Sequence, residues 1–297
     1  MTGHSGSLEV RLGELLEAVT GSSAPIRMGS WRRGGSINRT AVASQGNRQL
    51  FVKLNAVECG GMFEAERDGL LELAQAGTLR VPEPLCCGTH GAHAFLVMEH
   101  LDLQPRGDSA ALGRGLAAMH RIESDQFGWR RDNTIGLTPQ HNKHDGDWAR
   151  FWRTQRLGFQ LELARDNGFG AELVGPGMRL LDGIGDLMRG HNPAASLLHG
   201  DLWRGNAAFL PDGRPVVFDP AVYFGDRETD LAMCELFGGF EETFFSAYRD
   251  QYPMDQGYSV RRDLYQLYHV LNHLNLFGGA YLAQSRNLVL SLLAKLN

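Results

Sequence analysis

The pattern of apolar residues in this chain changes near Leu101. Before that point, alternating and short apolar runs predict strands, and the 3.6-residue period predicts two helices. The predicted strands cover 26–31, 39–44, 49–54 and 94–98, and the helices cover 8–19 and 62–76. After it, helical periodicity covers 108–121, 145–167, 172–189, 228–250 and 260–294, with one hairpin of strands at 206–210 and 215–218. We therefore expect an α+β chain of two lobes: a small, strand-rich N-terminal lobe of residues 1–101 and a larger, mostly helical C-terminal lobe of residues 102–297.

Charge and composition exclude several classes of partner. The 297 residues carry a net charge of −5 and no long Lys/Arg run, so a nucleic-acid partner is not expected. No apolar run approaches the roughly 18 residues that cross a bilayer, so no membrane partner is expected. The first residues lack the basic and apolar regions of a secretory leader. The four cysteines show neither metal-ligand spacing nor a disulfide framework, which favours a reduced, cytoplasmic protein.

The segment from Leu198 to Asn206 carries the strongest chemical signal. His199, Asp201 and Asn206 have the spacing H-x-D-x-x-x-x-N, which is that of a kinase catalytic loop. A carboxylate beside a hydroxyl group can orient it and accept its proton, so Asp201 is predicted to be the catalytic base. Asn206 offers a neutral oxygen to a hard cation, and we predict that it binds Mg²⁺.

A second carboxylate follows an apolar strand thirteen residues after Asn206. The strand residues 216–218 end at Asp219, which places this side chain at the strand's edge. From there it can bind the metal ions that bridge the β- and γ-phosphates of ATP. Protein kinases have Phe-Gly after this aspartate, whereas this chain has Pro220-Ala221. A flipping switch of the protein-kinase kind is therefore not implied.

Lys53 lies in an apolar strand, where an ammonium group is costly without a partner. Two glutamates of the following helix are within reach in the sequence, Glu66 and Glu64. We favour Glu66 because Leu70 and Leu73 give its helix face a side toward the core. The pair would present an ammonium group to the α- and β-phosphates.

The turn Gly34-Gly35-Ser36 lies between two predicted strands and upstream of Lys53. Its glycines would let backbone amides approach phosphate oxygens. A glycine turn, a strand lysine, a helix glutamate, the catalytic loop and a strand-end aspartate thus follow one another in order. This order predicts a protein-kinase-like fold that uses ATP and Mg²⁺.

Beyond these motifs, the chain resembles the fructosamine kinase (ketosamine-3-kinase) family, within the aminoglycoside and choline phosphotransferase group. The segment after His120 and Trp203 inside the catalytic loop distinguish this family from its relatives. The matching stretches are 34–38, 51–53, 62–66, 96–99, 116–120, 127–128, 132–136, 139–142, 148–151, 156–157, 199–206, 226–233 and 271–279.

The resemblance implies an ATP-dependent kinase for the 3-hydroxyl group of a ketosamine such as ribulosamine or fructosamine. The acceptor would be a small-molecule ketoamine or a glycated protein lysine, and the unstable product would make the reaction a deglycation step. It further implies that Met98 lies behind adenine and that the Glu99 carbonyl and the Leu101 amide bind the adenine edge. Trp203 would form a wall of the sugar pocket. Some relatives have a redox-active cysteine where this chain has Ser36, so no disulfide switch is expected at this turn.

Several alternatives stay open at this level. The acceptor of the kinase could be another small alcohol, such as an aminoglycoside, a choline-like base or a free sugar. A catalytically inactive nucleotide-binding module is a third possibility, against which the intact set of catalytic-type residues argues. Asp226 and Asp230 are either substrate contacts or a helix cap and a loop anchor. His199 is expected to hold the catalytic loop by hydrogen bonds, and His269 and His273 to form a polar stripe on a helix.

Overall fold

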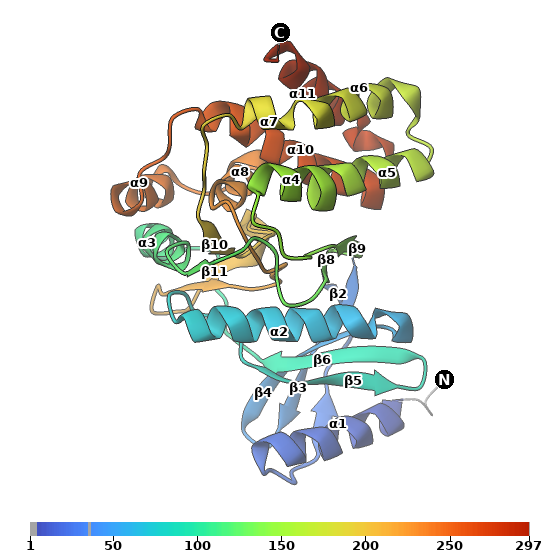
Figure 1. Cartoon of the computed structure of the whole chain (residues 1–297). Helices are drawn as coiled ribbons and strands as arrows, with labels where there is room; N and C mark the ends of the chain where they lie inside the picture. The colour runs from blue at the N-terminus through green and yellow to red at the C-terminus, as the bar shows by residue number, and fades with distance from the viewer. Residues whose placement is uncertain (1–4, 35–36, 297) are drawn as a thin grey trace.

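The fold is a computed structural model that describes residues 5–34 and 37–296. Its N-terminal part is an antiparallel sheet in the order β1-β3-β4-β6-β5, with β2 paired to β3. The strands are β1 (Ile26–Met28), β2 (Arg32–Gly34), β3 (Asn38–Gln45), β4 (Arg48–Ala56), β5 (Pro84–His90) and β6 (His93–Glu99). Helices α1 (Ser5–Thr20) and α2 (Gly60–Ala76) cover opposite faces of this sheet (Figure 1).

Strand β6 shows how the two faces are divided. Successive side chains of a strand point to opposite faces. Accordingly, Leu96 and Met98 belong to the core that contains α2, whereas Phe95 and Val97 belong to the core beneath α1. The continuous apolar run at 94–98 is therefore a strand that is buried on both sides.

The C-terminal part is mostly helical and lies on the far side of α2 from the sheet (Figure 1). Its helices are α3 (Ser109–Met119), α4 (Trp148–Phe151), α5 (Phe159–Asp166), α6 (Gly170–Asp182), α7 (Ile184–Leu187), α8 (Glu228–Leu236), α9 (Glu242–Gln251), α10 (Tyr258–Phe277) and α11 (Leu282–Ala294). A π-helical segment, Trp152–Gly158, joins α4 to α5. Among the described residues, no helix is both long and apolar enough to cross a membrane.

Short strands carry the loops between these helices. The predicted hairpin is present as β11 (Ala207–Phe209) and β12 (Pro215–Val217). Two further sheets were not predicted: β7-β10-β13 and the hairpin β8-β9. Their strands are β7 (Glu123–Ser124), β10 (Ala195–Leu198), β13 (Tyr223–Gly225), β8 (Asn133–Ile135) and β9 (Thr138–Gln140).

Two predicted helices are each divided by glycine. The segment 228–250 breaks into α8 and α9 at Gly238 and Gly239, whose φ angles are 67° and 91°. The segment 260–294 breaks into α10 and α11 at Gly278, where φ is 88°. Positive φ is incompatible with a continuing right-handed helix and costs glycine little. Each of these two predicted helical segments therefore contains two helices, and periodicity alone did not locate the break.

Candidate active site

A cleft of about 1120 Å³ lies between the sheet and the helical part. It brings together residues of β4, α2, the end of β6, the catalytic loop and the segment after β12. The sequence-predicted residues that line it are Lys53, Glu66, Met98, Glu99, Leu101, Asp201, Trp203, Asn206 and Asp219. Gly34 ends β2, and Gly35 and Ser36 lie outside the described residues, so a phosphate role for this turn stays a prediction.

Lys53 is the centre of an ion-pair cluster in the cleft. Its side chain is only 5% exposed, and Nζ donates a hydrogen bond of 2.5 Å to Oε1 of Glu66 and another to Oδ1 of Asp219. Burial disfavours the ammonium group, but the carboxylates of Asp219 and Glu66 outweigh it and raise the pKa of Lys53. The predicted pairing with Glu66 is thus present, whereas Glu64 lies near Arg131.

Helix α2 positions Glu66 because its apolar residues fix its orientation. Phe63, Leu70 and Leu73 are buried in the core shared with the helical part. The helix ends at Gly77, whose φ of 66° is the left-handed conformation of a helix stop. This end was predicted from the sequence.

The catalytic loop follows β10 and is held in place by hydrogen bonds of His199 and Asp230. His199 Nε2 donates to the Phe218 carbonyl at 3.0 Å, and its Nδ1 accepts from the Asp201 amide at 3.3 Å. Burial lowers the pKa of His199, which suits this neutral ring. Asp230 accepts from the amides of His199 and Gly200 at 2.8 and 2.9 Å. The expectation that His199 holds the loop is confirmed, and Asp230 is a loop anchor.

Asp201 and Asn206 face each other across this loop. Asn206 Nδ2 donates to the Asp201 carbonyl at 2.9 Å and to its carboxylate at 3.2 Å. The amide nitrogen is therefore occupied, and its oxygen is the atom suited to a metal. Burial, and then the charge of Asp219, raise the pKa of Asp201 to about 7. A carboxyl group with such a pKa can act as a base near neutral pH.

Asp219 has a strained backbone. Among the described residues it is the one non-glycine with positive φ, at 56°. Such conformations cost free energy and cluster at functional sites. Its neighbours are held firmly: Phe218 N donates to the Asn206 carbonyl at 3.0 Å, and Ala221 N to the His199 carbonyl at 2.8 Å.

The hairpin β8-β9 supplies two further anchors that sequence reasoning missed. Asn133 Nδ2 donates to the Val222 carbonyl at 2.8 Å, and Gln140 Nε2 donates to the Ala221 carbonyl at 3.0 Å. Both side chains are buried. They therefore fix the segment that follows Asp219. The only signal was their place in the stretches 132–136 and 139–142 that carry the family resemblance.

The donor set fits a hard divalent cation. Asn206 offers an amide oxygen and Asp219 a carboxylate, and their backbones are linked through the Phe218 amide. Oxygen ligands of this kind, with further sites left to phosphate, are those that Mg²⁺ prefers. The residues present therefore fit a hard divalent cation.

One part of the cleft lies where β6 ends. Met98 and Leu101 line the cleft, and within the described ranges the Leu101 amide has no hydrogen-bond partner. The Glu99 side chain is paired with Arg80 and accepts from the Glu83 amide at 3.1 Å. The Glu99 side chain is therefore engaged in contacts within the protein, and only its backbone is left for an adenine contact.

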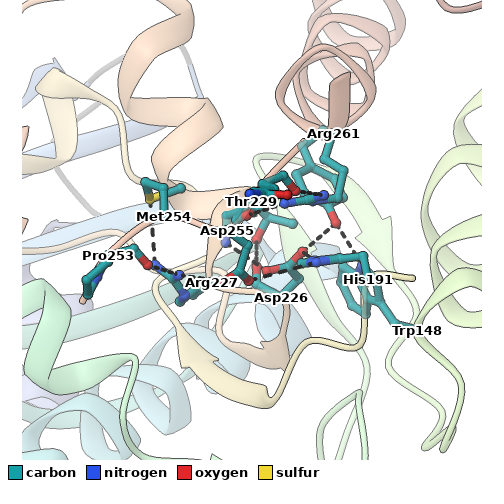
Figure 2. A network of polar contacts seen from close by, with 12 residues as sticks. Trp148, His191, Asp226, Arg227, Thr229, Pro253, Met254, Asp255 and Arg261 are labelled. Carbon is teal, nitrogen blue, oxygen red and sulfur yellow. Dashed lines mark hydrogen bonds and ion pairs between the residues drawn. The ribbon is translucent and has the colours of Figure 1, made fainter. Parts of the chain in front are cut away.

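Asp226 lies in a separate buried network (Figure 2). It accepts from His191 Nε2 at 2.7 Å, from the Tyr265 hydroxyl at 2.5 Å and from the Glu228 amide at 3.0 Å. Burial opposes ionisation, but the His191 hydrogen bond and charge outweigh it and lower the pKa of Asp226.

The same network contains Glu228, which could complete a three-residue metal cluster with His191 and Asp226. However, Arg261 binds both carboxylate oxygens of Glu228, at 2.6 and 2.7 Å. The negative charge is therefore already neutralised by a guanidinium group. Of the two alternatives for Asp226, the structure supports the helix cap, because it caps the start of α8 and is not among the cleft residues.

Comparison with known proteins gives a consistent result. The profile of the family described as fructosamine kinase matches residues 11–295. A probable ketoamine kinase of Synechocystis sp. is 44% identical over 260 residues, which is 86% of this chain and 87% of that protein. The chloroplastic protein-ribulosamine 3-kinase of Arabidopsis thaliana is 41% identical over 262 residues, covering 86% of this chain and 79% of that protein.

Solved structures agree with the sequence relatives. A candidate fructosamine-3-kinase from Haemophilus somnus superposes with a TM-score of 0.87 at 28% identity, covering 96% of this chain and 99% of that one. An aminoglycoside phosphotransferase, APH(4)-Ia, in a ternary complex with ADP and hygromycin B gives a TM-score of 0.61 at 18% identity, covering 97% and 98%. At 18% identity, the similarity to APH(4)-Ia shows only that the two proteins share a fold. The predicted α+β, protein-kinase-like fold is confirmed.

Proposed function

The chain belongs to the fructosamine kinase family, and from that premise we propose that it transfers the γ-phosphoryl group of ATP to the 3-hydroxyl of a ketosamine. Ribulosamine and fructosamine, free or on a protein lysine, are the acceptors that we propose. The observation that carries this proposal is the convergence of Lys53, Asp201, Asn206 and Asp219 in one cleft.

Each of these side chains has a role that its geometry supports. Asp201 orients the acceptor hydroxyl and takes its proton as the new O–P bond forms. Lys53, held by Glu66, presents its ammonium group to the α- and β-phosphates. Asn206 and Asp219 would hold Mg²⁺, which neutralises charge on the β- and γ-phosphates when bound.

The remaining predicted residues define the two ends of the cleft. Met98 lies behind adenine, and the backbones of Glu99 and Leu101 bind its edge. Trp203 is 41% exposed and lines the cleft two residues after Asp201, so it forms a wall of the acceptor pocket. The products are ADP and a ketosamine 3-phosphate, whose breakdown restores the free amine and makes the reaction a deglycation step.

A panel assay of ATP turnover tests this function. The chain is incubated with Mg-ATP and ribulose-lysine, fructose-lysine, free sugars, a choline-like base or an aminoglycoside, with Asp201→Asn as the control for contaminating kinases. We expect ADP release that depends on a ketoamine and is lost in the variant. Turnover with an aminoglycoside, a choline-like base or a free sugar, but with no ketoamine, would replace the proposed acceptor by another small alcohol.

A further inference from the structure

A cluster of aromatic rings forms part of the wall of the cleft. The His273 ring lies 4.8 Å from Phe237, 5.2 Å from Tyr281 and 5.5 Å from Phe277, between centroids. Phe237 in turn lies 6.5 Å from Trp203. All five residues line the cleft. The cluster is therefore continuous with the catalytic loop through Trp203.

The rings come from separate elements that the chain brings together at glycines. Phe237 directly follows α8 and precedes the Gly238-Gly239 break. His273 and Phe277 lie one turn apart on α10. The helix stops at Gly278, and the 3₁₀ turn Gly279–Tyr281 folds back so that Tyr281 contacts His273. The break that divides the predicted long helix thus also builds the ring cluster.

Hydrogen bonding fixes which nitrogen of His273 carries the proton. Nδ1 lies 2.8 Å from the backbone carbonyl of His269, one turn earlier in α10. A carbonyl oxygen only accepts, so Nδ1 is the protonated nitrogen. Burial lowers the pKa of His273, so the ring is neutral at pH 7. Nε2 is consequently a hydrogen-bond acceptor, and it has no partner in the part of the chain that the structure describes.

Among the described residues that line the cleft, no unpaired permanent positive charge opposes a cationic ligand. Among the described lining residues, Lys53 is the one side chain with a permanent positive charge, and it is already paired with two carboxylates. Of the carboxylates that line the cleft, Glu66 and Asp219 pair with Lys53 and Glu99 pairs with Arg80, which leaves Asp102 and Asp201. Aromatic faces are themselves electron-rich and attract cations within about 6 Å. A neutral acceptor nitrogen among such rings is suited to a protonated amine.

We propose that His273 Nε2 and the rings around it bind the protonated secondary amine of the ketoamine and so select ketoamines over other ketose derivatives. This inference rests on the proposed function and names the residue that recognises its substrate. A ketoamine carries its nitrogen on C1 and the acceptor hydroxyl on C3, so the two must be bound side by side. Asp201 binds the hydroxyl, and the neighbouring ring cluster receives the nitrogen.

Two acceptors that differ in one atom test the proposal. One is a fructosamine with a secondary amine at C1, and the other is its ether analogue with oxygen in that place. The ether is uncharged and has no N–H to donate. We expect the wild-type chain to favour the amine by about tenfold or more in kcat/KM, the worth of one charged hydrogen bond.

Variants of His273 then locate the source of that preference. His273→Phe keeps a ring and removes the acceptor, and we expect the amine's kcat/KM to fall about tenfold while the ether's falls less than threefold. His273→Gln offers an amide oxygen and should restore part of the preference. His144→Phe, a matched exchange at an exposed position away from the cleft, should leave both values unchanged. The KM for ATP should be the same throughout.

Two results would overturn the proposal. One is a wild-type chain that phosphorylates amine and ether equally well. The other is an equal loss for both acceptors in His273→Phe, which would mean that the residue only supports the pocket. A wild-type chain that phosphorylates neither these two acceptors nor the corresponding ribulosamine would refute the proposed function, and this inference with it, and that result is distinct from the other two.

Discussion

Asp201 shows how one carboxyl group is tuned by its surroundings. Its pKa is raised to about 7 by burial and by the charge of Asp219. Below that pH it carries the proton that it would have to accept from the acceptor. We therefore expect kcat/KM at saturating Mg²⁺ to rise with pH on a limb centred near or below 7, because a bound cation offsets the Asp219 charge. A pH–rate profile with no acidic limb between pH 5 and 8 would contradict the assignment.

The variant Asp201→Asn should have a lower turnover and, above neutral pH, a higher stability than wild type. Turnover should fall by ~10² to 10⁴, the usual contribution of a positioned acid–base group. The folded-state pKa exceeds the ordinary value of 3.8, so the folded chain binds this proton more tightly than the unfolded chain. The stability that this proton gives is present below pH 4 and is lost as the pH rises through 7.

Asparagine has no such proton to lose. The melting temperature of Asp201→Asn relative to wild type should therefore increase between pH 4 and pH 8, by ~2 to 4 °C if the effect is about 1 kcal/mol. Thermal unfolding at both pH values measures this difference. The melting temperature of the variant minus that of wild type could instead be the same at pH 4 and pH 8, or smaller at pH 8. Either result would show that the site of Asp201 does not disfavour its charged form.

Residues that act together were predictable where they lie close in the sequence. Glu66 follows Lys53 by thirteen positions, on the next element, and helix periodicity alone selected it over Glu64. Asn133 reaches Val222 across 89 positions, and Asp230 reaches His199 across 31. No local pattern encodes such distant partners, so these anchors of the catalytic loop and of the segment after Asp219 became visible only in the fold.

At the scale of elements, ion pairs and a hydrogen bond attach α2 to the loop that follows β7. Asp68 on α2 accepts from Arg131 at 2.8 Å and lies 3.6 Å from Arg130. Four residues on, Glu72 accepts from the Trp129 ring nitrogen at 3.3 Å. These contacts fix the helix that carries Glu66. The Lys53–Glu66 pair is consequently held from both lobes.

Asp68→Asn should loosen this clamp. We expect faster hydrogen exchange in the amides of α2 and a rise of about two- to fivefold in the KM for ATP, because Lys53 is less firmly positioned. Glu14→Gln on α1 is the matched control, since it removes only an exposed pair with Arg11. Unchanged exchange in α2 would indicate that apolar packing alone holds the helix.

The elements that the sequence did not predict share a physical reason. The hairpin β8-β9 has strands of three residues, contains Pro139, and is held by buried amide side chains in place of an apolar face. Asparagine, the residue type of Asn133, is depleted in strands. Strand β10, with the sequence Ala-Ser-Leu-Leu, is buried throughout, and four residues are too few to show a periodicity.

For the whole molecule, the larger core crosses the boundary between the lobes. Phe63, Leu70 and Leu96 from the first hundred residues pack in the same cluster as Leu197 and Leu271 from the helical part. A smaller second cluster lies between α1 and the sheet. The proposed boundary at 101/102 thus separates two lobes that share one hydrophobic core.

A single unfolding transition is the expected consequence. Calorimetry of the full chain should give one cooperative peak, because neither part can lose its partner without exposing the shared core. A fragment of residues 102–297 should fail to give native-like near-ultraviolet circular dichroism. Two separable peaks in the full chain would show that the lobes are stable independently.

The position of the α10 ring cluster bears on how such a protein diversifies. Lys53, Glu66, Asp201, Asn206 and Asp219 belong to the sheet, α2 and the catalytic segments, whereas His273, Phe277 and Tyr281 belong to the end of one helix and the turn after it. On the proposal above, a substitution at His273 changes acceptor choice without altering these five residues, although Trp203 and Phe237 of the same ring cluster lie elsewhere in the chain. Acceptor choice would then be open to change within one short stretch, residues 273–281, separately from the residues proposed for phosphoryl transfer.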